Sequence, residues 1–110
     1  MTDKPNLSEL MKKAQEMQKV MNEAHEALSR AEFIGISGGG MVEVTLTGRY
    51  DAKRVKFTDE AFEEGKEVLQ DLTAAAINDA VRKVEKASQD KMMRLTKDLG
   101  IPTGEGAEEK

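Results

Sequence analysis

The apolar positions near the start of the chain repeat with the spacing of an amphipathic helix. Steps of three and four residues alternate between them, which is the a and d rhythm of a coiled-coil seam. They are Leu7, Leu10, Ala14, Met17, Met21, Ala24, Leu28 and Ala31. Asn6 stands in the N-cap position, and Glu9 three residues later completes a capping box. The pattern predicts one long helix over about residues 7–31.

The period changes from helical to alternating after residue 31. The segments EFIGIS, MVEVTLT and KRVKFT each place apolar residues at every second position, which is typical of half-buried strands. The residues that this alternation assigns to the buried face are Ile34, Ile36, Val42, Val44, Leu46, Val55 and Phe57. The connections GGG and GRYDA are short enough for hairpins. We therefore predict a three-stranded antiparallel sheet with strands at about 32–37, 41–48 and 53–58.

The three consecutive glycines invite comparison with a phosphate-binding loop. Such a loop needs a helix after it, and the Walker form also needs Lys followed by Ser or Thr. Here Met41 and Val42 follow, and a strand begins. We interpret Gly38–Gly40 as a turn whose residues adopt positive φ.

A second apolar stripe predicts a helix over about residues 66–98. Its members are Leu69, Leu72, Ala76, Ala80, Val84, Met92, Leu95 and Leu99. Gly100 and Pro102 are typical helix stop signals. The small residues of TAAAINDAV indicate close packing, either on the sheet or on a partner helix. We expect the remaining residues, 101–110, to form a disordered acidic tail.

The predicted fold is α+β, with residues 1–110 forming a single domain. At 1.5 Å per residue the two helices would be roughly 37 and 50 Å long, whereas a compact domain of this length has a radius of gyration near ~13 Å. Both helices would therefore carry apolar surface beyond the cover of the sheet. We expect a homodimer that buries this surface, with projecting helical arms.

Composition excludes several classes of function. The chain has no cysteine, and His25, on a helix flank, is its only histidine. Zinc sites and thiol chemistry therefore lack their usual ligands. No serine or threonine stands in a nucleophile motif. We expect no enzyme, no metal, no cofactor and no small-molecule substrate. Without a signal peptide or an apolar run of membrane-spanning length, a soluble cytoplasmic protein is expected, with no membrane partner.

Basic charge is unevenly distributed, although the formal net charge is -4. Residues 82–97 hold six basic and two acidic residues, a net +4, while residues 57–81 hold seven acidic residues and one lysine, a net -6. A second basic group lies at the hairpin, and the first helix adds a third. These two groups are Arg49, Lys53, Arg54 and Lys56, and Lys12, Lys13 and Lys19. Such charges either make long helices soluble or contact phosphates.

Three segments in this order resemble the YbaB/EbfC family of bacterial nucleoid-associated proteins. They are LMKKAQEMQKVM, SGGGMVEVTLTGRYDAKRV and LQDLTAAAINDAVRKVE, and the resemblance spans about residues 7–102. It implies a homodimer whose paired helices project like tweezers and bind DNA in the nucleoid, in the bacterial cytoplasm. The DNA-facing positions that it implies are Lys12, Lys13, Lys19, Arg82, Lys83, Lys86, Arg94 and Lys97.

Two other functions fit the helical pattern. A helix–hairpin–helix interaction module, similar in outline to a prefoldin subunit, would hold protein clients between its helical tips. A scaffold for replication or recombination proteins is a further alternative. Three strands instead of one hairpin, together with the uneven charge of the second helix, favour DNA binding with weak or no sequence specificity.

Overall fold

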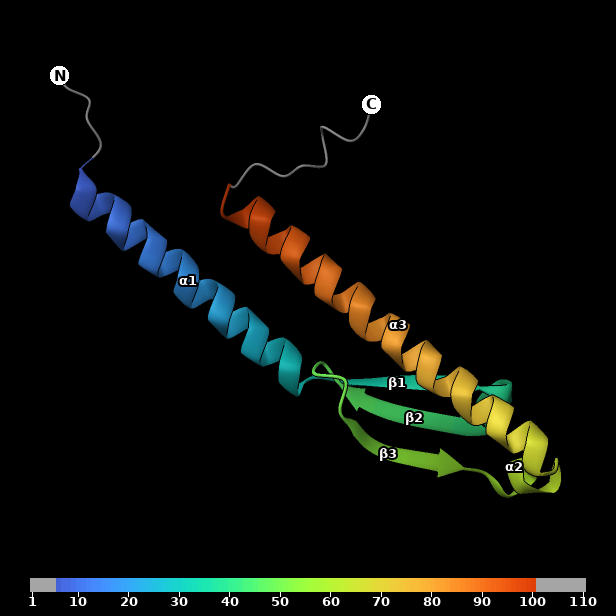
Figure 1. Ribbon diagram of the computed structural model, residues 1–110. Helices are drawn as coiled ribbons and strands as arrows, with labels where there is room; N and C mark the ends of the chain where they lie inside the picture. Colours follow the sequence, from blue (N-terminus) through green and yellow to red (C-terminus); the bar gives the residue numbers. More distant parts are fainter. Residues whose placement is uncertain (1–5, 101–110) are drawn as a thin grey trace, which may run out of the picture.

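The computed structural model describes residues 6–100, and its elements follow the predicted order (Figure 1). They are α1 (Leu7–Arg30), β1 (Glu32–Ser37), η1 (Gly38–Gly40), β2 (Val42–Thr47), β3 (Ala52–Phe57), α2 (Asp59–Glu63) and α3 (Lys66–Asp98). The predicted α+β class, with two long helices and a three-stranded antiparallel sheet, is confirmed. The predicted acidic tail, 101–110, lies outside the described residues.

Local signals explain where these elements begin and turn. The side chain of Asn6 accepts a hydrogen bond from the Ser8 amide at the start of α1. Gly38, Gly39 and Gly40 all have positive φ and form one tight turn between β1 and β2, as predicted. Thr58 caps the short helix α2, which the sequence pattern had not separated from the acidic turn.

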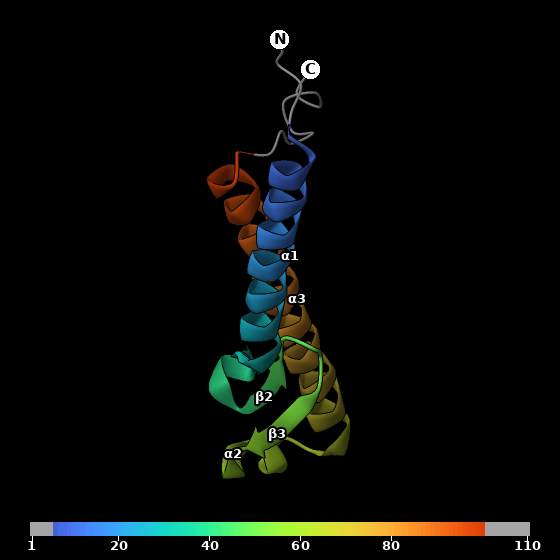
Figure 2. The same cartoon turned by 90° about the vertical axis from the view of Figure 1, so that its left-hand side faces the viewer.

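Helix α3 lies on β1 and β2 and leaves β3 uncovered (Figures 1 and 2). The strand order is β1-β2-β3, so β2 is central. The core consists of Val42, Val44, Leu46, Ala61, Ala76, Ala80 and Val84. The small residues of α3 thus pack on the chain's own sheet, the first of the two arrangements that TAAAINDAV allowed.

The predicted facing of β1 is wrong. Ile34 and Ile36 are each 44% exposed, whereas Gly35 is buried. Gly35 pairs with Val44 and therefore shares the sheet face that α3 covers. A Cβ atom at Gly35 would overlap the backbone of Ala76 and Ala80, so only glycine lets α3 approach this closely. This close approach places the two isoleucines on the opposite face.

The facing of β3 is correct, but its side chains are not buried in the single chain. Val55 pairs with Val44, and Phe57 pairs with Val42, so both lie on the face that carries α3. They remain 43% and 38% exposed because α3 does not reach β3. Phe57 contacts Phe62 of α2, with ring centroids 5.5 Å apart, and Phe62 is also exposed.

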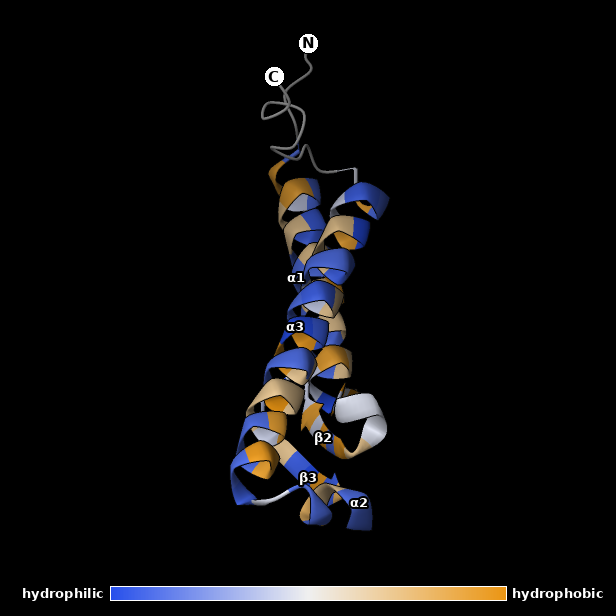
Figure 3. Cartoon of the chain, turned by 90° about the vertical axis from the view of Figure 1, so that its right-hand side faces the viewer, coloured by the Kyte–Doolittle hydropathy of each residue, from blue (hydrophilic) through white to orange (hydrophobic). Residues whose placement is uncertain are grey.

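Helices α1 and α3 extend together beyond one end of the sheet (Figure 1). The Cα radius of gyration is 20.9 Å and the extents are 77 × 34 × 15 Å, far from the ~13 Å of a compact chain of this length. Helix α1 has no buried residue, and Leu7 and Leu10 are 70% and 50% exposed. Apolar residues recur along both projecting helices (Figure 3). The predicted surplus of apolar surface is confirmed.

Candidate nucleic-acid interface

Helix α1 carries the first group of predicted DNA-facing residues. Lys12, Lys13 and Lys19 are exposed, and within residues 6–100 no carboxylate lies within 4.0 Å of any of them. Lys12 and Lys19 are seven residues apart, so they share one face of the helix, opposite the apolar seam. The lysine amino groups on this face of the first arm are therefore not engaged in ion pairs with the described residues.

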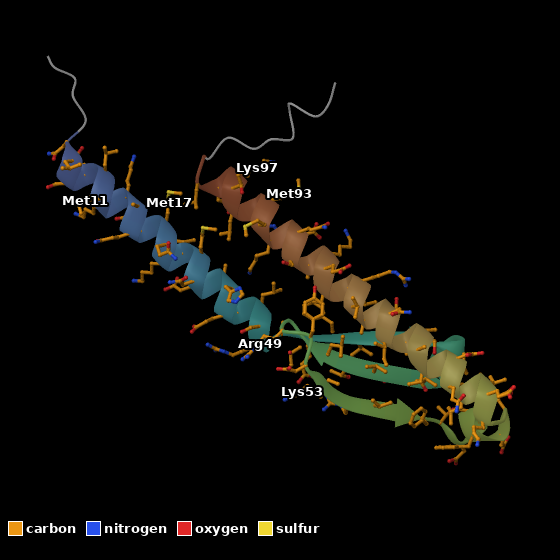
Figure 4. The ribbon with its side chains drawn as sticks, viewed as in Figure 1. Met11, Met17, Arg49, Lys53, Met93 and Lys97 are labelled. Atoms are coloured by element: carbon orange, nitrogen blue, oxygen red, sulfur yellow. The ribbon has the colours of Figure 1, made fainter. Side chains whose placement is uncertain are left out.

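Helix α3 carries the second group, whose members lie on three different surfaces. Arg82, Lys86 and Lys97 lie on the face away from the buried Ala80 and Val84. Lys86 forms an exposed ion pair with Asp90 at 3.5 Å, and such pairs exchange easily for other partners. Figure 4 labels Lys97 near the far end of the helix. The outward stripe therefore follows α3 from the sheet toward its end.

Arg94 belongs to a different surface. It lines a groove between the two arms, together with Val20, Ala24 and Ala27 of α1 and Lys91 and Leu95 of α3. Glu23 and Asp98 line the same groove, so Arg94 and Lys91 share it with two acidic residues. The sequence pattern placed Lys91 inside the apolar arc, and the structure agrees.

Lys83 is committed to the edge of the sheet. Its Nζ donates a 2.7 Å hydrogen bond to the carbonyl oxygen of Ile34 and lies 3.3 Å from the Asp79 carboxylate. Asp79 in turn accepts a 2.9 Å hydrogen bond from the Ile36 amide. The two side chains of α3 thus satisfy outward-facing backbone groups of β1 and block strand addition at that edge. Among the basic residues of α3, Lys83 is the one with both a backbone partner and an acidic partner.

The sequence contained one signal for the contact of Asp79 and Lys83 with the outer edge of β1. Asp79 and Lys83 are four residues apart on a helix, a spacing typical of an ordinary surface pair. Their contact with Ile34 and Ile36 depends on how α3 crosses β1, which spacing along the chain does not encode. Asp79 was therefore absent from the predicted functional residues.

The hydrogen bond from the Ile36 amide lowers the pKa of Asp79, and Lys83 and Arg82 add to the effect. A carboxyl group with a lowered pKa in the folded chain stabilises the fold above its unfolded pKa. This contribution disappears as pH falls through the folded value. Asp79 therefore favours the folded state at neutral pH and stops doing so in acid.

Asp79→Asn should lower the melting temperature at neutral pH, because the ion pair with Lys83 and the charged acceptor for Ile36 are lost. The difference in melting temperature between the variant and the unaltered chain should shrink as pH falls below the usual carboxyl range, because Asp79 of the unaltered chain also loses its charge there. Thermal unfolding followed by circular dichroism across this pH range measures both effects. A deficit that stays constant with pH would contradict the assigned role of the charge.

Metal binding finds no support in the part of the chain that the structure describes. It contains no group of three or more His, Asp or Glu side chains placed to hold an ion. His25 is exposed on α1. Within residues 6–100, no helix has a stretch long and apolar enough to cross a bilayer.

Comparisons with known proteins identify a family model, curated relatives and a solved structure that are similar to this chain. The model of the YbaB/EbfC DNA-binding family matches residues 3–99. A nucleoid-associated protein of Hahella chejuensis is 52% identical over 99 residues, covering 90% of this chain and 92% of its own. A nucleoid-associated protein of Legionella pneumophila strain Corby is also 52% identical, over 98 residues, covering 89% and 88%. The crystal structure of uncharacterized protein HP0035 from Helicobacter pylori has a TM-score of 0.69 at 25% identity, covering 84% of this chain and 98% of that one.

Proposed function

Because this chain belongs to the YbaB/EbfC DNA-binding family, we propose that it binds duplex DNA as a homodimer whose helical arms hold the phosphate backbone. The observation that carries the proposal is the row of exposed basic side chains along both arms. Lys12, Lys19 and Arg82 have no carboxylate within 4.0 Å among the described residues. The set proposed to face DNA is Lys12, Lys13, Lys19, Arg82, Lys86, Arg94 and Lys97, and it leaves out Lys83, which holds the edge of β1.

The distribution of charge along α3 supports this orientation. The basic half of the helix, residues 82–97, projects with α1, while the acidic residues cluster around α2 and the start of α3 at the opposite end of the sheet (Figure 1). Phosphates are attracted to the first region and repelled by the second. DNA is therefore expected at the arms, even though the whole chain is acidic.

Uncovered apolar surface supports the homodimer. The seam of α1 is largely exposed, and Val55 and Phe57 on β3 are only partly covered. A second copy would bury this surface and bring two pairs of arms together. Doubling the number of basic contacts would also compensate for the low basic charge of one chain.

Binding through arm lysines and arginines reads the phosphate backbone, which carries little sequence information. We therefore propose weak or no sequence preference, a location on the bacterial nucleoid in the cytoplasm, and a regulatory role toward the genes bound. The protein acts without an enzymatic step and without a cofactor.

A gel-shift series over salt concentration, on several unrelated duplexes, tests the proposal. The observed affinity should fall linearly on a log–log plot with a slope near 0.9 per phosphate contact, and similarly for each duplex. Light scattering of the protein without DNA, at low micromolar concentration, should give twice the chain mass of 12.1 kDa.

Four results would contradict parts of the proposal. A monomer in solution would remove the paired arms. Binding to only one duplex would contradict backbone recognition. Failure to bind any duplex, together with capture of an unfolded client protein, would favour the prefoldin-like alternative, and selective capture of replication or recombination proteins would favour a scaffold.

A further inference from the structure

The β2–β3 hairpin tip contains a residue in an unfavourable backbone conformation. Tyr50 has φ of +68° and is the only non-glycine residue with positive φ among residues 6–100. Side chains other than glycine, asparagine and aspartate are disfavoured there. Tyr50 is 51% exposed, so burial of the residue does not account for a tyrosine at this position.

Hydrogen bonds hold the tip in this conformation. The Thr47 hydroxyl accepts bonds from the amides of Arg49 and Asp51, at 3.1 and 3.2 Å. The Tyr50 amide donates to the Thr47 carbonyl at 2.9 Å, and the Thr47 amide donates to the Asp51 carbonyl at 2.8 Å. Strained residues that are fixed so firmly by their surroundings are concentrated at binding and catalytic sites.

The tip is attached to the base of the first arm. The Gly48 amide donates to the carbonyl oxygen of Ala31, and a Cβ at Gly48 would overlap the Leu28 carbonyl. Figure 4 shows Arg49 beside the end of α1, at the end of the sheet from which both arms project. A duplex held by the arms would therefore have the tip at its inner side.

The charge of the tip is suited to DNA. Residues 49–54 contain three basic residues and one acidic residue, Asp51, a net +2. Glu32 lies 3.1 Å from Arg54 and 4.0 Å from Lys53 and neutralises part of this charge. Arg49 has no carboxylate within 4.0 Å in the described part of the chain. The Arg49 guanidinium is thus free to bind a phosphate.

We propose that this tip is a second DNA-contacting element, distinct from the arms, in which Arg49 binds a backbone phosphate and the Tyr50 ring packs on the adjoining sugar and base edge. The inference rests on the proposed DNA-binding function. Because hydrogen bonds to Thr47 already fix the tip, both side chains are presented without the entropy cost of ordering a loop on binding. It also gives the complex a contact that reaches beyond the phosphates.

Two substitutions separate the two contacts. Arg49→Gln removes one charge, so the slope of log affinity against log salt should fall by about 0.9 for each tip that touches DNA. Tyr50→Asn should lower affinity by about tenfold, in the range seen when an aromatic contact to a base is removed, and leave the slope unchanged. Asparagine tolerates positive φ, so the melting temperature should be preserved.

Tyr50 also offers a direct probe, because it is the only tyrosine in the chain. Protein labelled with fluorotyrosine should give one fluorine NMR resonance, and a short duplex should shift or broaden it. Lys66→Gln, at the opposite end of the sheet, serves as the charge-matched control for Arg49→Gln and should leave the slope unchanged.

The outcomes distinguish this inference from the proposed function. If the unaltered chain binds DNA while both variants bind equally well and the fluorine resonance does not move, the tip is not a contact and the arms alone bind. If the unaltered chain binds no duplex, the proposed function and the tip contact are both wrong. If Tyr50→Asn lowers the melting temperature, the salt slope of Arg49→Gln and the fluorine shift still decide.

Discussion

Replacing Gly35 with alanine should destabilise the fold by about 3 kcal/mol, at the upper end of the usual cost of overpacking. The new Cβ would overlap the carbonyl oxygen of Ala76 and the amide nitrogen of Ala80, and would lie 2.8 Å from the Ala80 Cβ. The first two are backbone atoms of α3, so a change of rotamer cannot relieve the clash. Helix α3 would have to move off β1, which exposes the core.

Thermal unfolding measures this effect, and a fall in melting temperature of more than about 10 °C is expected for a chain of this size. Gly39→Ala makes the same chemical change in open space, where the only penalty is a φ of +64°. It should cost about 1 kcal/mol. Adding Ala80→Gly to Gly35→Ala should not restore stability, because the backbone overlap remains. Equal stability of the Gly35 and Gly39 variants would contradict the close contact.

The two long helices could be predicted from sequence because their signals are long and redundant. The start at Leu7 follows from Asn6 and the apolar rhythm, and α3 ends at Asp98, just before the stop signals Gly100 and Pro102. Many positions repeat the same period, so no single residue decides the assignment. The predicted ranges and the observed ones agree to within one residue.

The face of β1 could not be predicted because both of its faces are apolar. In EFIGIS, the pair of isoleucines looked like the buried set, whereas Phe33 and Gly35 are the residues under α3. What decides the facing is the distance of α3 from the sheet, a tertiary property that the alternation of a short strand does not contain. A glycine inside a strand was the available signal, since it often marks close approach of another backbone.

The sequence predicted which basic residues belong to the candidate interface, but not how their side chains are arranged in space. Lys83 and Arg82 are neighbours in sequence with equal charge, yet Lys83 caps the edge of β1 while Arg82 has no acidic partner within 4.0 Å among residues 6–100. Lys83 lies near β1 because of the way α3 crosses that strand. The position of Lys83 along the helix does not predict this contact. Composition identified the basic segment, and packing divides it into structural and available residues.

Reversing the charge of the outward stripe of α3 should cause the largest loss of DNA affinity. In Arg82→Glu with Lys86→Glu, each chain loses two candidate phosphate contacts, and each contact is worth nearly tenfold in affinity at ordinary salt through counterion release. We expect a loss of about a hundredfold or more, with a lower salt slope and the same loss on every duplex. Lys83 is left unchanged because its hydrogen bond to Ile34 supports the fold.

The control reverses two charges at the other end of the molecule, in Lys56→Glu with Lys66→Glu. Both lysines are exposed and, within residues 6–100, neither lies within 4.0 Å of a carboxylate, so the net charge changes equally in the two variants. Long-range attraction depends on net charge and would weaken in both, whereas direct contact weakens only at the arms. We expect the control to bind within about threefold of the unaltered chain at moderate salt, where charges farther away than the Debye length are screened. If the control loses as much affinity as the arm variant, the overall charge governs binding and the arm arrangement is wrong.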